Sequence, residues 1–228
     1  MQHSLINLKK DIIICGSKSY KNINLDNLVD QFGYIIRHNM LMHDQGYGKR
    51  HSSQQVLNAH VNNNLRMAER EFTDEYSNPS TISKKQLCEF YNFFKTNLSK
   101  TVYYNKNNTK LMMSLLDYFG INIRINKQIR VGMGSLAQLV NERKKPYMIG
   151  FSLSSNQFLT HAYNKRGMEY NKECHDLNCE IKIIKALHER KLIDASLCAI
   201  NDEGNLEADL GIKPTDTCRK IVETSNII

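Results

Sequence analysis

The stretch Glu173-Cys174-His175-Asp176-Leu177-Asn178-Cys179-Glu180 stands directly before an apolar run that is typical of a helix. It places potential metal ligands and an acid close to one helical turn. Downstream, Lys213-Pro214-Thr215-Asp216-Thr217-Cys218-Arg219-Lys220 places a thiol shortly after a proline, where a second helix is predicted to begin. Between the two, residues 195–201 are apolar enough for a buried strand and are followed by a turn at residues 202–204.

Two apolar runs upstream of this region predict a β-hairpin. They are residues 147–153 and 158–163, and the polar residues 154–157 that join them have the composition of a turn. With a helix from about Asp176, the predicted order for residues 146–228 is strand, strand, helix, strand, helix. The sequence therefore predicts a small α/β (α+β) unit in this part of the chain.

Residues 1–145 predict a mostly helical region. Apolar residues at three- and four-residue spacing predict a helix over residues 24–41, a second over residues 56–72, and a third that begins near Ser83. A fourth helix over residues 109–119 is expected to end at Gly120, which suits the position after a helix C-cap.

Shorter elements complete the N-terminal part. Residues 11–17 predict a buried strand that Gly16 ends, and a strand followed by Gly-Ser can cradle a phosphate, although no further Gly-rich pattern follows here. Residues 121–125 alternate as a half-exposed strand, and residues 135–143 predict a short helix. We place a domain boundary at residue 145, which divides the chain into regions 1–145 and 146–228.

The positive charge of the chain is concentrated before this boundary. Residues 1–145 hold 21 Lys and Arg against 11 Asp and Glu, whereas residues 146–228 hold 10 against 12. Such an excess favours a nucleotide, a nucleic acid or an acidic host protein as partner of the N-terminal region, and an ordinary solvated surface is the alternative interpretation.

The six cysteines are scattered over a chain that has no secretory signal pattern, so a disulfide framework is not expected. Core, metal-binding or catalytic roles are the remaining uses of these thiols. No apolar run reaches the length of a membrane span, and we predict no membrane partner. The expected location is the cytoplasm, or export as an effector by a route that reads no classical signal peptide.

Taken together, the order of elements and the motifs Asn178-Cys179-Glu180 and Pro214-Thr215-Asp216-Thr217-Cys218-Arg219 resemble the cytidine deaminase-like superfamily. In that family the first helix carries His-x-Glu or Cys-x-Glu, and the second carries Pro-Cys-x-x-Cys. The resemblance covers about residues 146–224 only. Its nearest branch looks like the bacterial toxin and effector deaminases, which join this small domain to variable N-terminal regions.

The resemblance implies a zinc-dependent hydrolase that deaminates a cytosine- or adenine-type base in a nucleotide or nucleic acid. Three ligands would hold the zinc, which lowers the pKa of a bound water, and a glutamate would shuttle protons. By position Glu180 would be that glutamate and Cys218 a zinc ligand. The entire interpretation depends on Glu180 and Cys218 facing each other across one pocket.

The sequence departs from the family pattern at two ligand positions, Asn178 and Thr215, neither of which is a strong zinc ligand. The zinc site would then be His175, Cys179 and Cys218, with Cys174 as an alternative ligand. In this interpretation the substrate pocket is lined by Asn178, Thr215 and His161.

Other interpretations of these residues stay open. Asp176 can be a helix cap, Glu180 can complement the helix dipole, and Cys179 can be a core residue. The protein can be a metal-free binding module of the same fold that grips a nucleic acid or a host protein. It can also be a cysteine-dependent enzyme with Cys179 or Cys174 as nucleophile and His161 or His175 as base.

Overall fold

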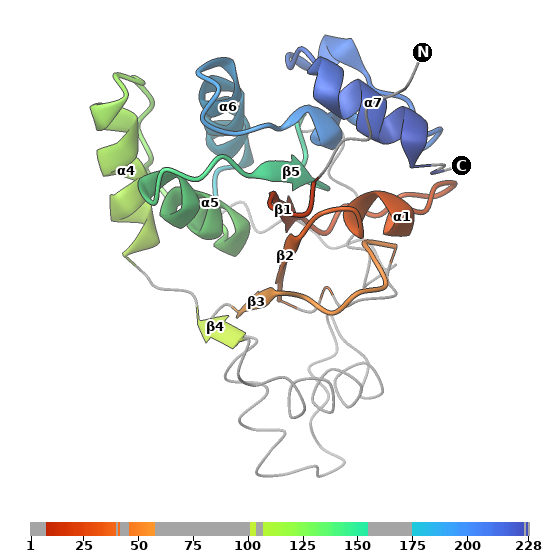
Figure 1. The fold of residues 1–228 in the computed structure, drawn as a ribbon. Helices are drawn as coiled ribbons and strands as arrows, with labels where there is room; N and C mark the ends of the chain where they lie inside the picture. The colour runs from red at the N-terminus through yellow and green to blue at the C-terminus, as the bar shows by residue number, and fades with distance from the viewer. Residues whose placement is uncertain are drawn as a thin grey trace, which may run out of the picture.

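The computed structural model describes residues 8–39, 41, 46–57, 101–103, 107–154, 175–225 and 227. Within them the chain forms an α/β fold around one five-stranded sheet (Figure 1). The strands are β1 (Ile12–Cys15), β2 (Tyr34–His38), β3 (Gln54–Leu57), β4 (Thr101–Tyr103) and β5 (Tyr147–Ile149). They lie in the order β4-β3-β2-β1-β5, and all neighbouring pairs are parallel. The prediction of an α/β fold is confirmed.

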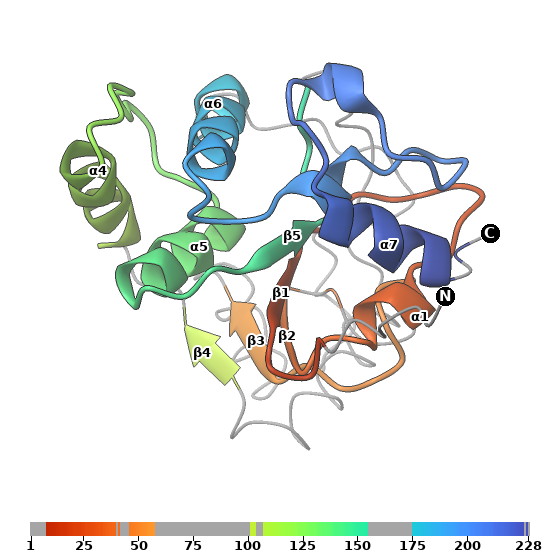
Figure 2. The same cartoon turned by 45° about the horizontal axis from the view of Figure 1, so that its top comes forward.

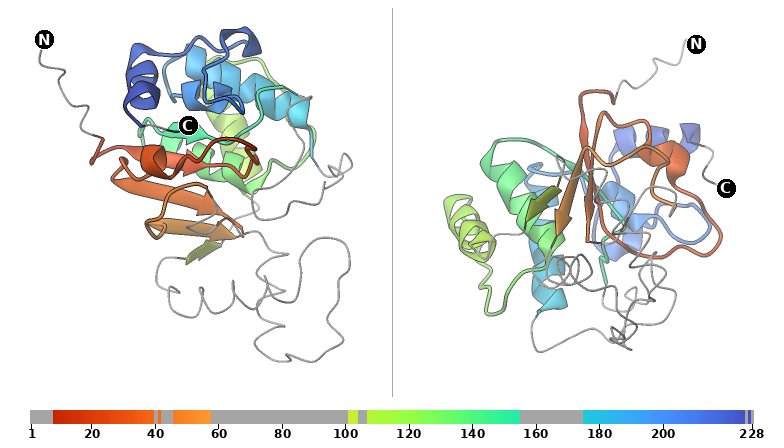
Figure 3. Two further views of the ribbon diagram at one scale, coloured as in Figure 1. Left: turned by 90° about the vertical axis from the view of Figure 1, so that its right-hand side faces the viewer. Right: turned by 90° about the horizontal axis from the view of Figure 1, so that it is seen from below.

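Helices cover both faces of the sheet, which is the usual way to bury parallel strands. One face carries α4 (Asn108–Tyr118), α5 (Val131–Asn141) and α6 (Leu177–Glu189), and the other carries α1 (Asp26–Val29) and α7 (Asp216–Thr224) (Figures 2 and 3). Two 3₁₀ helices, η3 (Ser196–Ala199) and η4 (Ala208–Leu210), follow α6.

Strand β1 is uniformly apolar in sequence because both faces of the sheet are covered at this strand. Successive side chains of a strand point to opposite faces of its sheet, so both faces need apolar residues when both are covered. Ile14 packs in the cluster under α4, α5 and α6, whereas Ile13 and Cys15 pack in the cluster under α1 and α7. All three side chains are fully buried.

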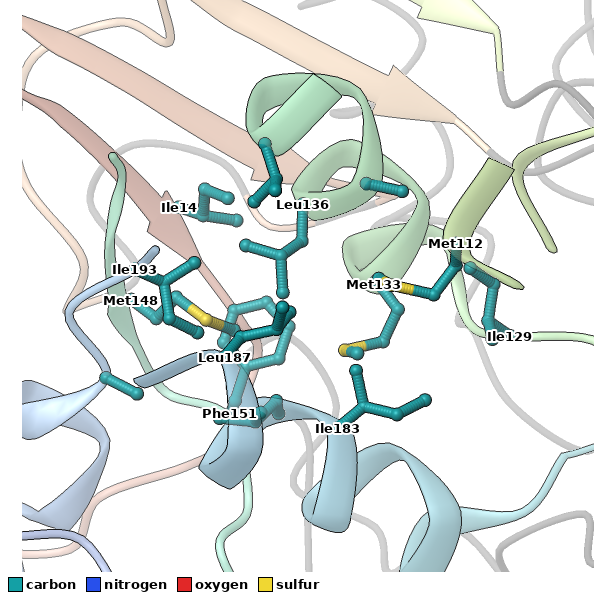
Figure 4. Packing of buried hydrophobic residues seen from close by; sticks show 14 of the residues in the cluster. Ile14, Met112, Ile129, Met133, Leu136, Met148, Phe151, Ile183, Leu187 and Ile193 are labelled. Atoms are coloured by element: carbon teal, nitrogen blue, oxygen red, sulfur yellow. The ribbon is translucent and has the colours of Figure 1, made fainter. Parts of the chain in front are cut away.

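The larger cluster lies between the sheet and α4, α5 and α6 (Figure 4). Ile14 and Met148 come from the strands, Met133 and Leu136 from α5, and Leu187 from α6 (Figure 4). The Met and Leu side chains at helical spacing are therefore core residues.

Two helix starts that the sequence predicts are confirmed, together with the cap interpretation of Asp176. The Asp176 carboxylate accepts a hydrogen bond from the backbone N–H of Cys179 at 3.0 Å and caps α6. Thr215 caps α7 in the same way, because its hydroxyl oxygen accepts from the N–H of Cys218 at 3.3 Å. Local cap chemistry decides both positions.

The predicted end of α4 at Gly120 is also confirmed. Gly120 has a φ of +62°, and the N–H of Ile121 donates to the carbonyl of Leu116 at 2.8 Å, which closes the last turn.

The predicted helix over residues 24–41 is wrong. Only α1 is helical, and the chain turns at Gly33 into strand β2. Gly33 donates its N–H to Leu8 O at 3.0 Å, and a Cβ on Gly33 would lie 1.7 Å from Lys9 O. This close backbone contact accepts only a glycine. Ile35 and Ile36, which looked like one helix face, point to opposite faces of the sheet.

Other predicted elements differ as well. Residues 54–57 form β3 where a helix from residue 56 was predicted, residues 121–125 form no strand, and the apolar run 195–201 contains η3 instead of a strand. The helix predicted over residues 135–143 is α5, which begins earlier, at Val131. The predicted third helix, the second strand of the hairpin and His161 lie outside the described residues.

Strand β5 does not pair with a hairpin partner among the described residues but lies parallel to β1, with Ile14 opposite Met148. Strand β1, which precedes the predicted boundary at residue 145, thus pairs with β5, which follows it. The division into two domains stays a prediction. Within the described part of the chain, no helix is long and apolar enough to span a membrane.

Candidate functional site

Glu180 lies in the first turn of α6 and is almost fully buried, with 2% of its side chain exposed. One carboxylate oxygen accepts the backbone N–H of Arg130 at 2.7 Å, and the other forms an ion pair with Arg130 Nε at 2.5 Å. Arg130 directly precedes α5. Glu180 therefore joins the beginnings of α6 and α5.

We expect Glu180→Gln to lower the free energy of unfolding by about 2 kcal/mol, because it replaces charge-assisted hydrogen bonds with neutral ones and leaves Arg130 without its carboxylate. Urea unfolding of the purified variant measures this. Glu189→Gln, at the exposed end of the same helix, is the matched control and should change stability by less than about 0.5 kcal/mol. Equal effects of the two substitutions would contradict a structural role for the Glu180–Arg130 pair.

Cys218 is fully buried at the start of α7, in the cluster under α1 and α7. Its neighbour Thr215 donates its hydroxyl to Asp194 at 2.8 Å and its N–H to the hydroxyl oxygen of Ser196 at 3.0 Å. Burial, followed by the charge of Asp194, raises the pKa of Cys218 to about 12. The thiol therefore stays protonated at neutral pH.

Cys179 lies in the other cluster, under α4, α5 and α6, where its thiol donates to Arg124 O at 3.4 Å. Burial raises its pKa as well. The interpretation of Cys179 as a core residue is thus consistent with its surroundings. Among the described residues, no three His, Cys, Asp or Glu side chains come together in a way that could hold a metal ion.

The structure does not bring the expected pair together. Glu180 is held by Arg130 at the start of α5, whereas Cys218 lies with Thr215 and Asp194 at the start of α7, beneath the opposite face of the sheet. Asn178 is exposed on the first turn of α6. Of the remaining predicted site residues, His161 and Cys174 lie outside the described residues.

A different set of residues gathers at the carboxyl edge of the sheet, where the parallel strands end. The backbone N–H of Gly16 donates to Ile149 O at 2.7 Å, and that of Lys18 donates to Gly150 O at 3.1 Å. A Cβ on Gly16 would lie 2.2 Å from Gly150 O. The ends of β1 and β5 therefore meet backbone to backbone.

This contact lies at the point where the strand order reverses. From β1 the sheet continues through β2, β3 and β4 on one side, and β5 lies on the other. In open α/β sheets, ligands bind outside the carboxyl ends of the strands at such a reversal point. We call the residues gathered here, 16–18, 38–39, 130–135 and 150–154, the switch-point edge.

His38 ends β2 at this edge and is buried. Its Nδ1 lies 2.9 Å from Cys15 O and its Nε2 lies 3.0 Å from the Ser135 hydroxyl. Because a carbonyl only accepts, Nδ1 carries the proton and Nε2 accepts from Ser135. Burial lowers the pKa of His38 to about 4, despite the opposing effect of the bond to Cys15. The imidazole is therefore neutral and ties β1, β2 and α5 together.

This burial predicts a loss of stability in acid. The pKa of His38 is about 4 in the folded protein against 6.5 in an unfolded chain, so the unfolded state binds the proton first. The contribution of neutral His38 to the free energy of unfolding is fully present above pH 6.5. It falls by roughly 3 kcal/mol as the pH drops to 4. Urea unfolding between pH 7 and 4 should show this slope, and His38→Gln should flatten it. An unchanged slope in the variant would assign the acid sensitivity to other groups.

The beginning of α5 completes the edge. The N-cap residue Arg130 makes no side-chain cap bond, so the first N–H groups of this eleven-residue helix have no side-chain acceptor from the cap. Gly132 lies against the Phe151 ring. A Cβ on Gly132 would lie 2.7 Å from an atom of that ring. Helix N-termini of this kind favour anionic groups.

His175 lies at the entry to the same helix. Its Nδ1 is 2.7 Å from Gln128 O, two residues before Arg130, and its side chain is partly exposed. His175 thus lies beside the switch-point edge, with different neighbours from those the zinc interpretation required. A partly exposed imidazole is accessible to a bound substrate and can accept a proton from it.

The amino ends of the same strands offer a contrasting space. An open cavity of about 370 Å³ lies there, flanked by Lys10, Tyr34 and Gln54 at the beginnings of β1, β2 and β3. It lies at the other end of the strands, where the ligand rule for α/β sheets does not apply.

The strand followed by Gly16-Ser17 is visible in the sequence, but one glycine is a weak pattern for a ligand site. The stronger signal would have been the contact of Gly16 with Gly150, and this depends on strand pairing between residues 134 positions apart in the chain, with Ile14 opposite Met148 as the neighbouring pair. No local motif reports that pairing.

The fold and the edge together define the class of an open parallel α/β sheet whose strand order reverses between β1 and β5. No family model and no curated protein matches the sequence. Two solved structures of the sialyltransferase CstII from Campylobacter jejuni share the fold. The complex with the substrate analogue CMP-3FNeuAc has a TM-score of 0.51 at 16% identity and covers 96% of this chain and 90% of that chain. The complex with cytidine-5'-monophosphate has a TM-score of 0.50 at 18% identity and covers 96% and 88%.

These structures overturn the deaminase interpretation. The likeness to a sialyltransferase fold extends over 96% of the chain, whereas the deaminase motifs covered only its C-terminal third. The interpretation as a zinc-dependent hydrolase, toxin or effector is wrong, and the binding module based on the same fold falls with it. The motifs misled because a cap residue, an acid in the first turn and a thiol after a proline occur at the beginnings of many helices.

Proposed function

We propose that the protein is a glycosyltransferase that transfers a sugar from a CMP-activated donor to a hydroxyl group of an acceptor. The observation that carries the proposal is the switch-point edge between β1 and β5, in a chain whose fold resembles a sialyltransferase that is known with CMP and with CMP-3FNeuAc. The nucleotide would lie along residues 16–18 and the beginning of α5.

The geometry supports this placement in two ways. Gly16 lets the ends of β1 and β5 meet backbone to backbone, because a Cβ there would lie 2.2 Å from Gly150 O, and this contact fixes the edge along which the nucleotide would lie. The first N–H groups of α5 and the amine of Lys18 supply positive electrostatic potential where the nucleotide phosphate would lie.

The proposed reaction is a substitution at the anomeric carbon of the donor sugar. A bond forms between the acceptor oxygen and that carbon, and the bond from the carbon to the phosphate oxygen breaks. CMP leaves with the bonding electrons. His175 takes the proton of the acceptor hydroxyl as general base, a role that suits a partly exposed imidazole.

The proposed function changes the binding partner that was predicted from the sequence. The basic N-terminal part was predicted to bind a nucleotide or a nucleic acid, and the proposed ligand is a nucleotide sugar. The phosphate contact would come from Lys18 and the backbone after β1, and no polymer is needed to explain it.

The test is donor-dependent release of CMP. The purified chain is incubated with CMP-N-acetylneuraminic acid and a panel of oligosaccharide acceptors, and free CMP and the extended glycan are quantified. Release of CMP that depends on an acceptor and is matched by product supports the proposal. Transfer from UDP- or GDP-sugars but not from the CMP donor would overturn it.

A further inference from the structure

Lys18 has surroundings that a surface lysine does not have. Its side chain is partly buried, its Nζ donates to Ile200 O at 3.3 Å, and it lies 4.7 Å from the centroid of the Tyr20 ring. Burial lowers its pKa, against the opposing charges of Asp202 and Glu207. The amine is thus taken partly out of water and held by a neutral carbonyl and an aromatic face.

Among the described residues, no carboxylate forms an ion pair with the Lys18 amine. In the described part of the chain, the ion pairs join Arg130 to Glu180, Lys144 to Glu142 and His188 to Asp194, and none includes Lys18. A partly desolvated charge that has opposite charges nearby but no direct ion pair still costs free energy. A bound anion would lower that cost and would gain a charge-assisted hydrogen bond.

The backbone fixes Lys18 at the switch-point edge. Its N–H donates to Gly150 O at 3.1 Å, and its carbonyl accepts the Tyr47 hydroxyl at 2.6 Å. Both contacts hold the residue two positions beyond Gly16, above the end of β5. The amine is therefore carried by a rigid part of the fold, which suits a residue that recognises a ligand.

A purely structural role is the competing explanation. Lys18 Nζ bonds Ile200 O, and the N–H of Lys21 bonds Asp202 at 3.3 Å, so the two residues connect the loop after β1 to the segment around Ile200. A lysine that only connects two segments would affect stability and would act equally on ligands with and without a phosphate. This difference can be measured.

We propose that Lys18 binds the phosphate of the donor nucleotide and stabilises the negative charge that develops on it as the sugar leaves. The inference rests on the proposed function and names a residue that recognises its substrate. Lys18 exchanges its bond to Ile200 O for a phosphate oxygen when the nucleotide binds, and Tyr20 keeps the amine above its ring.

The experiment compares CMP with cytidine, which differ by the phosphate alone. Calorimetric titrations are made with the wild type, Lys18→Met, Lys18→Arg and the control Lys21→Met, whose side chain is exposed in the same loop. We expect Lys18→Met to weaken CMP binding about 10-fold or more and to leave cytidine binding within about 2-fold. Lys18→Arg should restore most of the affinity, and Lys21→Met should behave as the wild type.

The outcomes separate this inference from the proposed function. If the wild type binds CMP and Lys18→Met binds it equally well, or loses CMP and cytidine to the same extent, the role of Lys18 is refuted and the proposed function stands. If the wild type binds no CMP, the proposed function fails and the inference fails with it. Thermal unfolding of each variant confirms that the comparison is made between folded proteins, and Lys18→Gln, which also removes the charge but can keep a hydrogen bond to Ile200 O, replaces Lys18→Met if that variant unfolds.

Discussion

Replacing His175 by Gln is expected to lower kcat for glycosyl transfer by about 10²–10⁴-fold and to leave CMP affinity within about 3-fold. The imidazole is partly exposed beside the entry to α5 and is placed by its contact with Gln128 O at 2.7 Å. A glutamine preserves size and hydrogen bonding but cannot accept the proton of the acceptor hydroxyl. The loss should therefore fall on the chemical step.

The measurement is steady-state CMP release together with direct titration of CMP. His51→Gln, an exposed histidine close to the start of β3, is the matched control and should keep full activity. Wild-type kcat in His175→Gln, or an equal loss of CMP affinity, would show that His175 is not the base.

Replacing Gly150 by Ala is expected to lower the free energy of unfolding by about 3–4 kcal/mol, the sum of two independent costs. Gly150 has a φ of +71°, a conformation in which an L-residue is strained. A Cβ there would also lie 2.2 Å from the Tyr47 hydroxyl oxygen. Tyr47 would have to move, and its hydrogen bond to Lys18 O would be lost.

Gly120→Ala separates the two costs. Gly120 has a φ of +62°, yet nothing lies within 4 Å of the position that its Cβ would take. This control has the cost of the backbone strain alone, and we expect it to lower the free energy of unfolding by about 1 kcal/mol. Urea unfolding of both variants gives the difference. If Gly150→Ala were no worse than Gly120→Ala, the close contact with Tyr47 would not be a real constraint on the switch-point edge.

The parts of the fold that were predictable from the sequence are those decided by local chemistry. Asp176 and Thr215 mark the starts of α6 and α7, and Gly120 marks the end of α4, because caps and glycine turns act over a few residues. Strand β1 was predicted from its uninterrupted apolar run, which reflects burial on both faces of the sheet.

The parts that were missed depend on distant pairings. Ile35 and Ile36 complete a helical pattern with the residues of α1, and only the pairing of β2 with β1 and β3 puts them on opposite faces of a sheet. The run 195–201 is apolar because its residues are buried in both clusters, Ala195, Cys198 and Ala199 in the one under α4, α5 and α6, and Leu197 and Ile200 in the one under α1 and α7. This burial does not require a strand. Apolar character reports burial in each case and leaves the backbone conformation undecided.

The candidate site was missed for the same reason. Gly16, His38 and Gly150 are separated widely in the sequence and meet because the carboxyl ends of parallel strands share one edge. A metal role was predicted for His175 from neighbouring thiols that the structure places in the core or leaves outside the described residues. A motif within one helix gives no information about the beginning of α5, beside which His175 lies.

The most direct test of the central claim, that the edge where β1 and β5 meet binds a CMP-activated sugar, is a crystal structure of the chain with CMP. The account predicts the phosphate beside residues 16–18 and the first turn of α5, within hydrogen-bond distance of Lys18 Nζ. CMP bound elsewhere on the protein, or crystals that take up none of the nucleotide at millimolar concentration, would contradict it.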